Sequence, residues 1–297
     1  MELETFVAVA RAGSISKAAE RLGVAKSVVS RRLADLEERL GTPLISRTTR
    51  RMSLTGQGDG LLQRAEAILD DIEDAEAAVR SVHGELSGRL RVAAPLSFGL
   101  IVLQPLVAEF ASANPKVLID IDLADRNVDL VQEGFDVALR IGQLADSSLV
   151  ARKVAPVRMV VAAAPAFWER HGTPKTPHDL EDLPCLYYSR TGKMAPIRYW
   201  GPQGARGTLS PPARFVANNG DFMAMAAAQE LGFVIGPRFI VAKALAEGSL
   251  AAVLTDHAWS DSSLYLVYPP TRRPSARVRA FADAVLASLK ADYPDGL

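Results

Sequence analysis

The stretch Ser14–Gly41, SISKAAERLGVAKSVVSRRLADLEERLG, decides the fold of the N-terminal part of the chain. It predicts two helices joined by a tight turn at Gly23. The small residues Ala18 and Ala19 stand where the two helices would touch, and the β-branched Val29 stands on the buried side of the second helix. This spacing is typical of the helix-turn-helix, whose second helix enters the major groove of DNA.

The second helix is expected to run from about Lys26 to Leu40, with one apolar and one polar side. The apolar side is formed by Val29, Leu33, Leu36 and Leu40. Near the start of the helix, the polar side presents the hydroxyls and cations that reach base edges, on Lys26, Ser27, Ser30 and Arg31. We therefore predict that these four residues contact DNA bases, and we expect Ser14 or Ser16 to cap the preceding helix.

A basic turn follows between two short apolar segments. Residues 42–45 and 52–55 predict two short strands, and residues 46–51 predict the turn between them, an arrangement called a wing. Its cations and hydroxyls suit contacts to DNA phosphates, and the candidates are Arg47, Thr49, Arg50 and Arg51. The alternative for Arg50 and Arg51 is an ordinary solvated loop.

The sequence from residue 57 to about residue 83 predicts one long helix with a heptad seam. The seam is formed by Leu61, Ala65, Ile68, Ile72, Ala75, Val79 and Val82. A stripe this narrow needs a second helix against it, and helix-turn-helix proteins commonly read two half-sites as dimers. We therefore predict that the seam is a dimerisation surface, with packing on the same chain as the alternative.

Charge is distributed unevenly along the chain. The 34 basic and 34 acidic residues cancel, which gives no overall attraction to nucleic acid or to an anionic membrane. Residues 11–51 nevertheless hold ten basic and four acidic residues, and residues 57–86 hold two basic and eight acidic ones. A basic head followed by an acidic stalk favours DNA binding at the N-terminal end.

Beyond a helix break at residues 83–88, short strand patterns alternate with helix patterns. This alternation predicts a mostly parallel sheet covered by helices. The expected elements include a helix over residues 98–112, a short helix near residues 128–133 and a strand over residues 263–268.

In open α/β sheets a ligand binds beyond the carboxyl ends of the strands. The residues at those ends, with two aromatic residues as an expected wall, form the candidate effector site of Ser97, Phe98, Asp125, Arg126, Arg140, Gly142, Tyr199, Trp200, Asn219 and Pro237. A guanidinium such as that of Arg140 binds carboxylates well. The predicted ligand is therefore a small organic acid.

Each of these residues also has a structural alternative. Ser97 and Asn219 could simply cap the helices that follow them. Arg140 could pair with a nearby aspartate, Asp125 or Asp136, and so hold the fold. Trp200 could belong to the core or to its cover.

Catalytic and metal-binding patterns are absent from the sequence. The histidines His83, His171, His178 and His257 stand apart, with no HExxH pair, no GxSxG elbow and no Walker loop. The glycine-rich residues 56–60 follow the wing and lack the strand context of a phosphate loop. These observations predict neither an enzyme nor a metal or cofactor site.

Cys185 is the only cysteine, which excludes an intrachain disulfide and a cysteine metal cage. It is either a redox sensor or a buried, inert thiol. The sequence shows no secretory signal and no charge-free apolar stretch long enough to span a bilayer, so we expect a cytoplasmic protein. A solute-binding protein and a sequence-indifferent DNA binder remain alternative functions.

The whole chain resembles the LysR-type transcriptional regulators, in particular the CrgA-like branch. The resemblance rests on Phe6, Gly13–Ile15, Ala18–Ala19, Leu22–Val24, Val29–Arg31, Leu36–Glu37, Leu40–Gly41, Pro43–Leu44, Arg47 and Leu54–Thr55, and on residues 124–130, 133–136, 140–142 and 146–150. The family often has a serine and a glutamine where this chain has Ala25 and Lys26, so the usual cap of the reading helix is missing. Ile45 stands where a phenylalanine is usual.

The resemblance implies a multi-domain fold with a winged helix-turn-helix, a long linker helix and a two-lobed α/β domain similar to periplasmic solute-binding proteins. The expected domains are residues 1–58, 59–86 and 87–297, with lobe I at about 87–160 and 268–297 and lobe II at about 161–267. The resemblance further implies a homotetramer, built as a dimer of dimers, that binds an interrupted inverted repeat of double-stranded DNA. A small-molecule effector would bind in the cleft, and RNA polymerase is a candidate partner.

Overall fold

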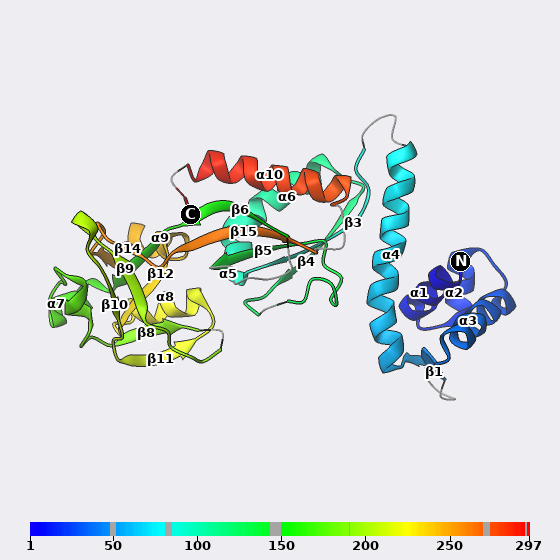
Figure 1. The fold of residues 1–297 in the computed structure, drawn as a ribbon, viewed down its shortest axis with the longest axis horizontal. Helices are drawn as coiled ribbons and strands as arrows, with labels where there is room; N and C mark the ends of the chain where they lie inside the picture. Colours follow the sequence, from blue (N-terminus) through cyan, green and yellow to red (C-terminus); the bar gives the residue numbers. More distant parts are fainter. Residues whose placement is uncertain are drawn as a thin grey trace. The chain divides into compact units, whose positions relative to one another are not determined.

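The computed structural model of the chain describes residues 1–47, 52–80, 85–126, 128–142, 150–189, 191–269, 274–294 and 296–297. The chain divides into two compact units (Figure 1). The first unit holds residues 1–89 with the short segments 116–118 and 129–135, and the second holds the remaining residues.

The first unit begins with three helices, a two-stranded antiparallel wing and one long helix. These elements are α1 (Glu2–Ala12), α2 (Ile15–Leu22), α3 (Lys26–Leu40), β1 (Ile45–Arg47), β2 (Met52–Leu54) and α4 (Gly56–Arg80). Each of the first three helices ends at a glycine in the left-handed conformation, Gly13, Gly23 or Gly41, with φ of 59°, 65° and 67°. The predicted helix-turn-helix, wing and linker helix are therefore confirmed.

The core of the helix-turn-helix is formed by the apolar side of α3 and its neighbours. Phe6 of α1 and Val29 and Leu33 of α3 are fully buried in it. The start of α4 closes this core, because Ala65 is fully buried and Leu61 packs against the same cluster. The first part of the heptad seam thus packs on its own chain.

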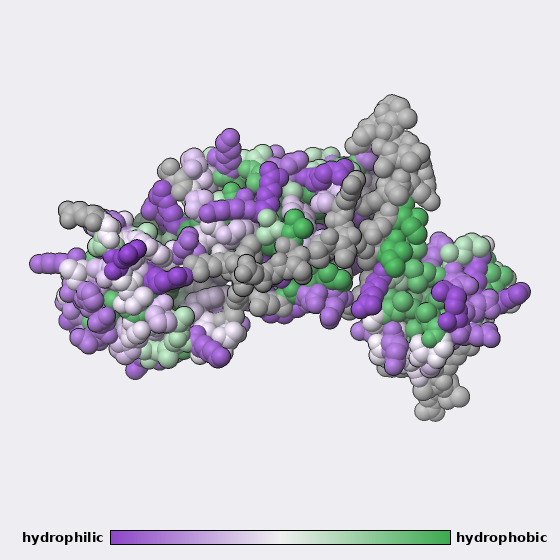
Figure 2. All heavy atoms as spheres, in the orientation of Figure 1, coloured by the Kyte–Doolittle hydropathy of each residue, from purple (hydrophilic) through white to green (hydrophobic). Residues whose placement is uncertain are grey.

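The next residues of the seam are exposed. The side chains of Ile68 and Ile72 are 48% and 51% accessible, and Figure 2 shows an apolar surface over the described part of α4. The exposed apolar surface that a second helix would cover therefore begins at Ile68. The side chains of Ala75 and Val79, and residue Val82, lie outside the described part of the chain.

Glu37 of α3 fixes the entry to the wing. Its Oε1 atom accepts hydrogen bonds from the backbone N–H groups of Leu44 and Ile45, at 2.8 and 3.1 Å. A carboxylate that binds two backbone donors restrains their position strongly. The angle at which the chain leaves α3 is therefore set by a side chain of the reading helix itself.

The wing joins α4 through a close backbone contact. The hydroxyl of Thr55 donates to the carbonyl of Pro43 at 2.8 Å and accepts from the N–H of Gly58 at 3.0 Å. A Cβ atom on Gly58 would lie 2.0 Å from the Leu44 carbonyl oxygen. The glycine-rich residues 56–60 thus start a helix that packs tightly against the wing, and they do not form a phosphate loop.

The second unit holds two five-stranded sheets, which we call the sheets of lobe I and lobe II. The lobe I sheet has the strand order β4-β3-β5-β15-β6. Its elements are β3 (Gly88–Ala94), α5 (Leu96–Phe98), the π-helical turn η1 (Gly99–Leu103), α6 (Gln104–Ala113), β4 (Val117–Leu123), β5 (Val137–Gly142), β6 (Val150–Val157), β15 (Ser262–Tyr268) and α10 (Ala276–Asp292).

The lobe II sheet has the order β11-β8-β12-β7-β13, and a small sheet β10-β9-β14 lies in the same lobe. The elements are β7 (Met159–Ala163), α7 (Pro165–His171), η2 (Pro177–Leu180), β8 (Cys185–Tyr188), β9 (Ile197–Trp200), η3 (Pro202–Gly204), β10 (Arg206–Leu209), β11 (Ala213–Ala217), α8 (Gly220–Ala228), β12 (Phe233–Pro237), α9 (Arg238–Ala246), β13 (Ala251–Val253) and β14 (Ala258–Trp259).

Both large sheets are mixed, which corrects the expectation of a mostly parallel sheet. The pairs β3–β5, β8–β11 and β8–β12 are parallel. The pairs β15–β5, β15–β6, β12–β7 and β7–β13 are antiparallel. The short helix expected near residues 128–133 is a turn in the structure.

Two chain crossings connect the lobes. The first is Arg158, between β6 and β7, and the second is Ser260–Asp261, between β14 and β15. Since β15 pairs with β5 and β6, the return to lobe I occurs at about residue 262, before the expected boundary at 268. Ser260 has a φ of 58°, a strained conformation for a residue other than glycine.

One described segment, Leu96–Ala113, is long and apolar enough to cross a membrane by length and composition. In the structure it forms α5, η1 and α6, and it carries one charged residue, Glu109. Phe98, Leu103 and Phe110 on this segment are buried, and the Phe110 ring packs edge-on against Phe281 of α10, with 5.4 Å between the centroids. The segment is thus a core helix of lobe I in this structure.

Candidate functional site

The first turns of α3 form the candidate DNA-reading surface. Lys26, Ser27 and Arg31 are exposed and Ser30 is half-buried, on the side of the helix opposite the core residues. Ala25 holds the N-cap position and provides no side-chain hydrogen bond. The backbone N–H groups of the first turn therefore lack a side-chain cap from Ala25, and they face the same region as the candidate base contacts.

Arg31 keeps its guanidinium accessible. Its Nε atom lies 3.9 Å from Oδ2 of Asp35, one turn along the helix, and its side chain is 85% exposed. An exposed pair at this distance stabilises the helix by less than about 1 kcal/mol, so a phosphate or base can replace it at low cost. Thr49, Arg50 and Arg51 lie outside the described residues, as does the side chain of Arg47.

Other cations of the basic head bind acidic partners within the first unit. Arg39 of α3 contacts Glu2 at 2.9 Å, and Arg11 of α1 contacts Glu66 of α4 at 2.8 Å. These pairs tie α1 to α3 and to α4, and they neutralise part of the positive charge counted in the sequence. Ser14 occupies the N-cap position of α2 but makes no capping hydrogen bond with its side chain, contrary to expectation.

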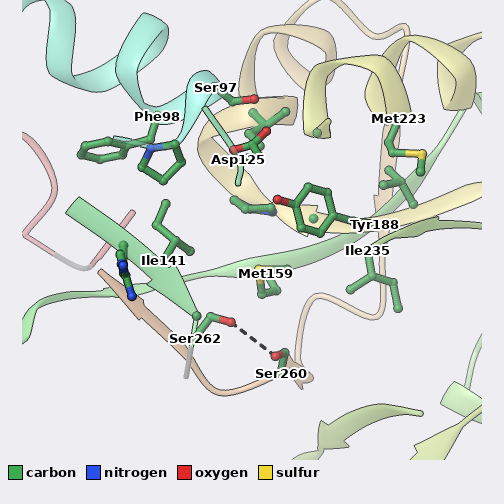
Figure 3. A pocket seen from close by; sticks show the side chains of 18 of the residues that line it. Ser97, Phe98, Asp125, Ile141, Met159, Tyr188, Met223, Ile235, Ser260 and Ser262 are labelled. Atoms are coloured by element: carbon green, nitrogen blue, oxygen red, sulfur yellow. Dashed lines mark hydrogen bonds between the residues drawn. The ribbon is translucent and has the colours of Figure 1, made fainter. Parts of the chain in front are cut away.

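A cavity of about 510 Å³ in the second unit is the candidate ligand site. Its walls come from both lobes (Figure 3). Seven of the ten predicted residues line it, namely Ser97, Phe98, Asp125, Arg126, Arg140, Gly142 and Pro237. Ser97 and Asp125 lie on one side of the view in Figure 3, and Ser260 and Ser262 lie on the other. The roles of these residues in ligand binding stay predictions.

Three predicted residues do not line the cavity. Tyr199 and Trp200 belong to β9 in the small sheet, where Tyr199 packs against Trp259 with 5.9 Å between ring centroids. Trp200 is partly exposed on this strand. Asn219 accepts the backbone N–H of Phe222 at 2.8 Å and so caps α8, which is the structural alternative named for it.

Sequence reasoning missed most of the apolar wall of the cavity. Met159, Met223 and Ile235 line it beside Tyr188 of β8. Tyr188 could have been found, because it is the last residue of the lobe II strand β8, whereas Ile235 lies in the middle of β12. Met159 and Met223 carry no such signal, since apolar residues in strands and helices occupy cores far more often than ligand sites.

The polar groups of the cavity are held by specific hydrogen bonds. The Ser97 hydroxyl donates to Oδ2 of Asp221 at 2.5 Å. Oδ1 of Asp125 accepts the backbone N–H of Leu96 at 3.2 Å, and Nη2 of Arg140 donates to the carbonyl of Val128 at 2.7 Å. Each group is thus oriented before any ligand binds, which lowers the entropic cost of binding.

Cys185 reaches the cavity wall but remains buried, with 1% of its surface accessible. Burial raises the pKa of the Cys185 thiol to about 12. Burial, together with the charge of the nearby Cys185, also raises the pKa of the Tyr187 hydroxyl to about 12. A thiol in this state is a poor nucleophile and a poor redox sensor. Among the described residues, no group of three or more His, Cys, Asp or Glu side chains could hold a metal ion.

Two family models match the chain. Residues 1–59 match the bacterial regulatory helix-turn-helix protein of the LysR family, and residues 83–290 match the LysR substrate binding domain. These matches cover the reading head and the two-lobed unit that holds the cavity.

Relatives of known sequence span nearly the whole chain. The transcriptional regulator CrgA of Neisseria meningitidis serogroup B is 33% identical over 289 residues, covering 97% of this chain and 96% of the relative. The regulator PtxR of Pseudomonas aeruginosa is 35% identical over 284 residues, covering 95% of this chain and 90% of the relative. Both relatives are named as regulators of transcription and not as enzymes.

Solved structures give the same result. The structure of CrgA from Neisseria meningitidis is 33% identical, covers 97% of this chain and 98% of its own, and has a TM-score of 0.59. The full-length structure of AphB, a virulence activator of Vibrio cholerae, is 25% identical, covers 96% and 98%, and has a TM-score of 0.60. The chain therefore belongs to the LysR family of bacterial helix-turn-helix transcriptional regulators.

Proposed function

We propose that a small organic acid binds in the cavity between the lobes and changes how the reading helices engage DNA. The observation that carries this proposal is the charge of the cavity wall. Among the described lining residues, Arg126, Arg140, Lys193 and Arg198 are cationic and Asp125 is acidic. Since Arg126 is paired with Asp122 at 2.9 Å, the cations Arg140, Lys193 and Arg198 outnumber the acidic Asp125. An excess of cations in a partly enclosed site favours an anionic ligand, and the apolar wall favours one with an apolar body.

Sequence-specific DNA binding follows from the reading head. Exposed hydroxyls and cations at the start of α3 suit base edges, with Arg31 as the strongest candidate for a bidentate contact to guanine. The exposed Ile68 and Ile72 support pairing through α4. Two heads held this way would read an inverted repeat, and a dimer of dimers would read its two halves together. For such a regulator we expect a cytoplasmic location and RNA polymerase as a partner at the promoter.

The DNA part of the proposal is tested by salt titration on a site selected from random DNA and on a scrambled duplex of the same length. A regulator keeps a specificity ratio of about 10³ or more over the scrambled duplex. Equal affinities for both duplexes would favour a sequence-indifferent DNA binder. Replacing Arg50 by alanine should weaken binding to both duplexes alike and lower the salt slope by about one unit.

The ligand part is tested by thermal-shift screening of the full chain against small aliphatic and aromatic acids and their uncharged amides. An acid that binds the wild type should lose its stabilising effect in Arg140→Ala. Because this change also deprives the Val128 carbonyl of its donor, the unliganded melting temperature must be compared first. An unchanged response in Arg140→Ala removes the support for an organic acid at this residue.

A further inference from the structure

One hydrogen bond joins the two lobes beside the cavity. Ser97 lies in α5, directly after the lobe I strand β3, and Asp221 lies in α8 of lobe II. The Ser97 hydroxyl donates to Oδ2 of Asp221 at 2.5 Å, across 124 residues of sequence. Ser97 is 95% buried, since only 5% of its surface is accessible. A short bond to a carboxylate in such a place is stronger than a neutral hydrogen bond in water.

A second contact lies next to it. The ring of Phe98 in lobe I packs edge-on against Phe239 of α9 in lobe II, with 6.1 Å between the centroids. On the lobe II side, the start of α8 lies close to α9, since a Cβ atom on Gly220 would lie 2.5 Å from Cδ1 of Ile240. The two lobes thus meet at this point through one polar and one aromatic contact.

The polar contact determines which hydrogen bonds Ser97 can offer a ligand. A serine hydroxyl has one hydrogen to donate and two lone pairs that accept. Its hydrogen is committed to Asp221, so Ser97 presents only acceptor capacity to the cavity. Asp125, at the same side of the cavity, is also an acceptor when ionised. This side of the cavity therefore suits a donor such as a hydroxyl or amino group and disfavours a carboxylate.

We propose that Asp221 is a specificity-determining residue that holds the lobes together through Ser97 and makes Ser97 an acceptor toward the ligand. The ligand is then an organic acid that carries a hydroxyl or amino group at the end that meets Ser97. This inference rests on the proposed function as far as the ligand is an acid. The contact between the lobes does not depend on it.

The test must separate the contact between the lobes from a second role of Asp221, which is the stabilisation of its own helix α8. As the second residue of α8, its charge also interacts favourably with the start of that helix. Asp221→Asn removes the charge but keeps an oxygen that can accept from Ser97, whereas Asp221→Ala removes both. Ser97→Ala removes the contact and leaves the charge of Asp221 in place. Ser112→Ala is the matched control, because this hydroxyl bonds only within its own helix in the described contacts.

The contact is measured without any ligand, by spin-label distances in the full chain. Labels are attached at Glu169→Cys in α7 of lobe II and Lys290→Cys in α10 of lobe I, both exposed in the structure. The buried Cys185 stays unlabelled, and an excess of unlabelled chain suppresses distances between chains. A hydrogen bond to a charged group is worth about 10- to 100-fold in an equilibrium, so Ser97→Ala and Asp221→Ala should raise the ratio of separated to joined lobes by that factor.

The variants give opposite results under the two roles. If the contact holds the lobes, Ser97→Ala and Asp221→Ala show the same larger population at a longer distance, and Ser97→Thr restores the original distribution. Asp221→Asn lies between them and the wild type, because its oxygen accepts without a charge. Ser112→Ala stays at the wild type. If Asp221 acts only on α8, Ser97→Ala overlays the wild type, and the proposal is overturned. Should Asp221→Ala fail to fold, Ser97→Ala alone decides the result.

The polarity of Ser97 is measured with two probes of equal length, 4-(hydroxymethyl)benzoate and terephthalate. The wild type should be stabilised more by 4-(hydroxymethyl)benzoate. In Asp221→Ala the Ser97 hydrogen is free to donate to a carboxylate, so terephthalate should become the better ligand, with a change of about tenfold in the ratio of the two affinities. An order that is the same in both proteins overturns the specificity role. If neither probe binds either protein, the organic-acid proposal fails, and the distance measurements still decide whether Ser97 and Asp221 join the lobes.

Discussion

Replacing Gly58 by alanine should destabilise the reading head, because this glycine lies where α4 meets the wing. A Cβ atom at residue 58 would lie 2.0 Å from the carbonyl oxygen of Leu44 and 3.2 Å from Cδ2 of Leu54. The obstacle is backbone, and it is held in place, since the Leu44 carbonyl accepts the N–H of Thr55 at 2.9 Å. The wing and the start of α4 must therefore separate by about 1 Å or more to reach an ordinary contact distance.

The expected magnitude is the difference between two effects. Alanine in a helix is favoured over glycine by about 1 kcal/mol. Overpacking costs about 1–3 kcal/mol, and each hydrogen bond of the Leu44 carbonyl that breaks costs about 1 kcal/mol more. The net loss is about 2 kcal/mol, which lowers the melting temperature of a unit of this size by about 8–16 °C.

Gly60→Ala is the matched control. It lies two residues along the same helix and is exposed, and a Cβ atom added there would have no neighbour within 4 Å. It should therefore gain up to about 1 kcal/mol from helix propensity. Thermal unfolding of the full chain, followed by circular dichroism and calorimetry, compares the two variants. If Gly58→Ala is as stable as Gly60→Ala, the close approach of α4 to the wing is refuted.

Three further predictions concern pairing, the buried thiol and the reading surface. Ile68→Asp with Ile72→Asp should lower the oligomeric state in sedimentation velocity, because both side chains are exposed apolar residues of α4, and an unchanged sedimentation coefficient contradicts pairing through this surface. Cys185, with a pKa of about 12, should have about 10⁻⁴ of its thiol ionised at pH 8. It should therefore react with a thiol reagent only after unfolding in urea, and rapid labelling of the folded chain contradicts its burial. Arg31→Ala should cost about 1–3 kcal/mol on the selected DNA site and flatten its base preference. Arg32→Ala, whose side chain contacts Met1, should leave base preference intact, and identical behaviour of the two variants counts against base reading by Arg31.

The sequence was most informative where structure depends on neighbouring residues. The turn at Gly23 and the stripe of Val29, Leu33 and Leu36 predicted the helix-turn-helix correctly, because each feature is set within a few residues. The heptad seam predicted the long helix equally well. It did not reveal that Ala65 packs into the core of the reading head, since the same spacing suits a partner on either chain.

Strand direction was not predictable from the pattern. A buried strand such as β7 or β15 has the same apolar composition whether its neighbour runs parallel or antiparallel. The lobe boundary was placed too late for the same reason, because Ser262–Tyr268 gives no local sign that it pairs with Val137–Gly142 rather than with a strand of lobe II.

The residues that line the cavity were predicted well at strand ends and poorly elsewhere. Ser97, Asp125 and Arg140 follow from the rule that ligands bind at carboxyl ends of strands. The partner of Ser97 did not, because Asp221 comes from another lobe and reads in sequence as an ordinary acidic residue at a helix start. Contacts of this kind become visible only when the two lobes are seen together.

The two crossings at Arg158 and Ser260–Asp261 have a consequence for synthesis on the ribosome. All strands of the lobe II sheets lie between residues 159 and 259, as one continuous insertion. The lobe I strand β15 lies between β5 and β6 in its sheet. The lobe I sheet therefore cannot be completed until residues 262–268 have been synthesised. Since domains fold as units while the chain emerges, lobe II should fold during translation before lobe I is complete. The edge of β5 opposite β3 would then be open to intermolecular pairing during translation, until β15 emerges.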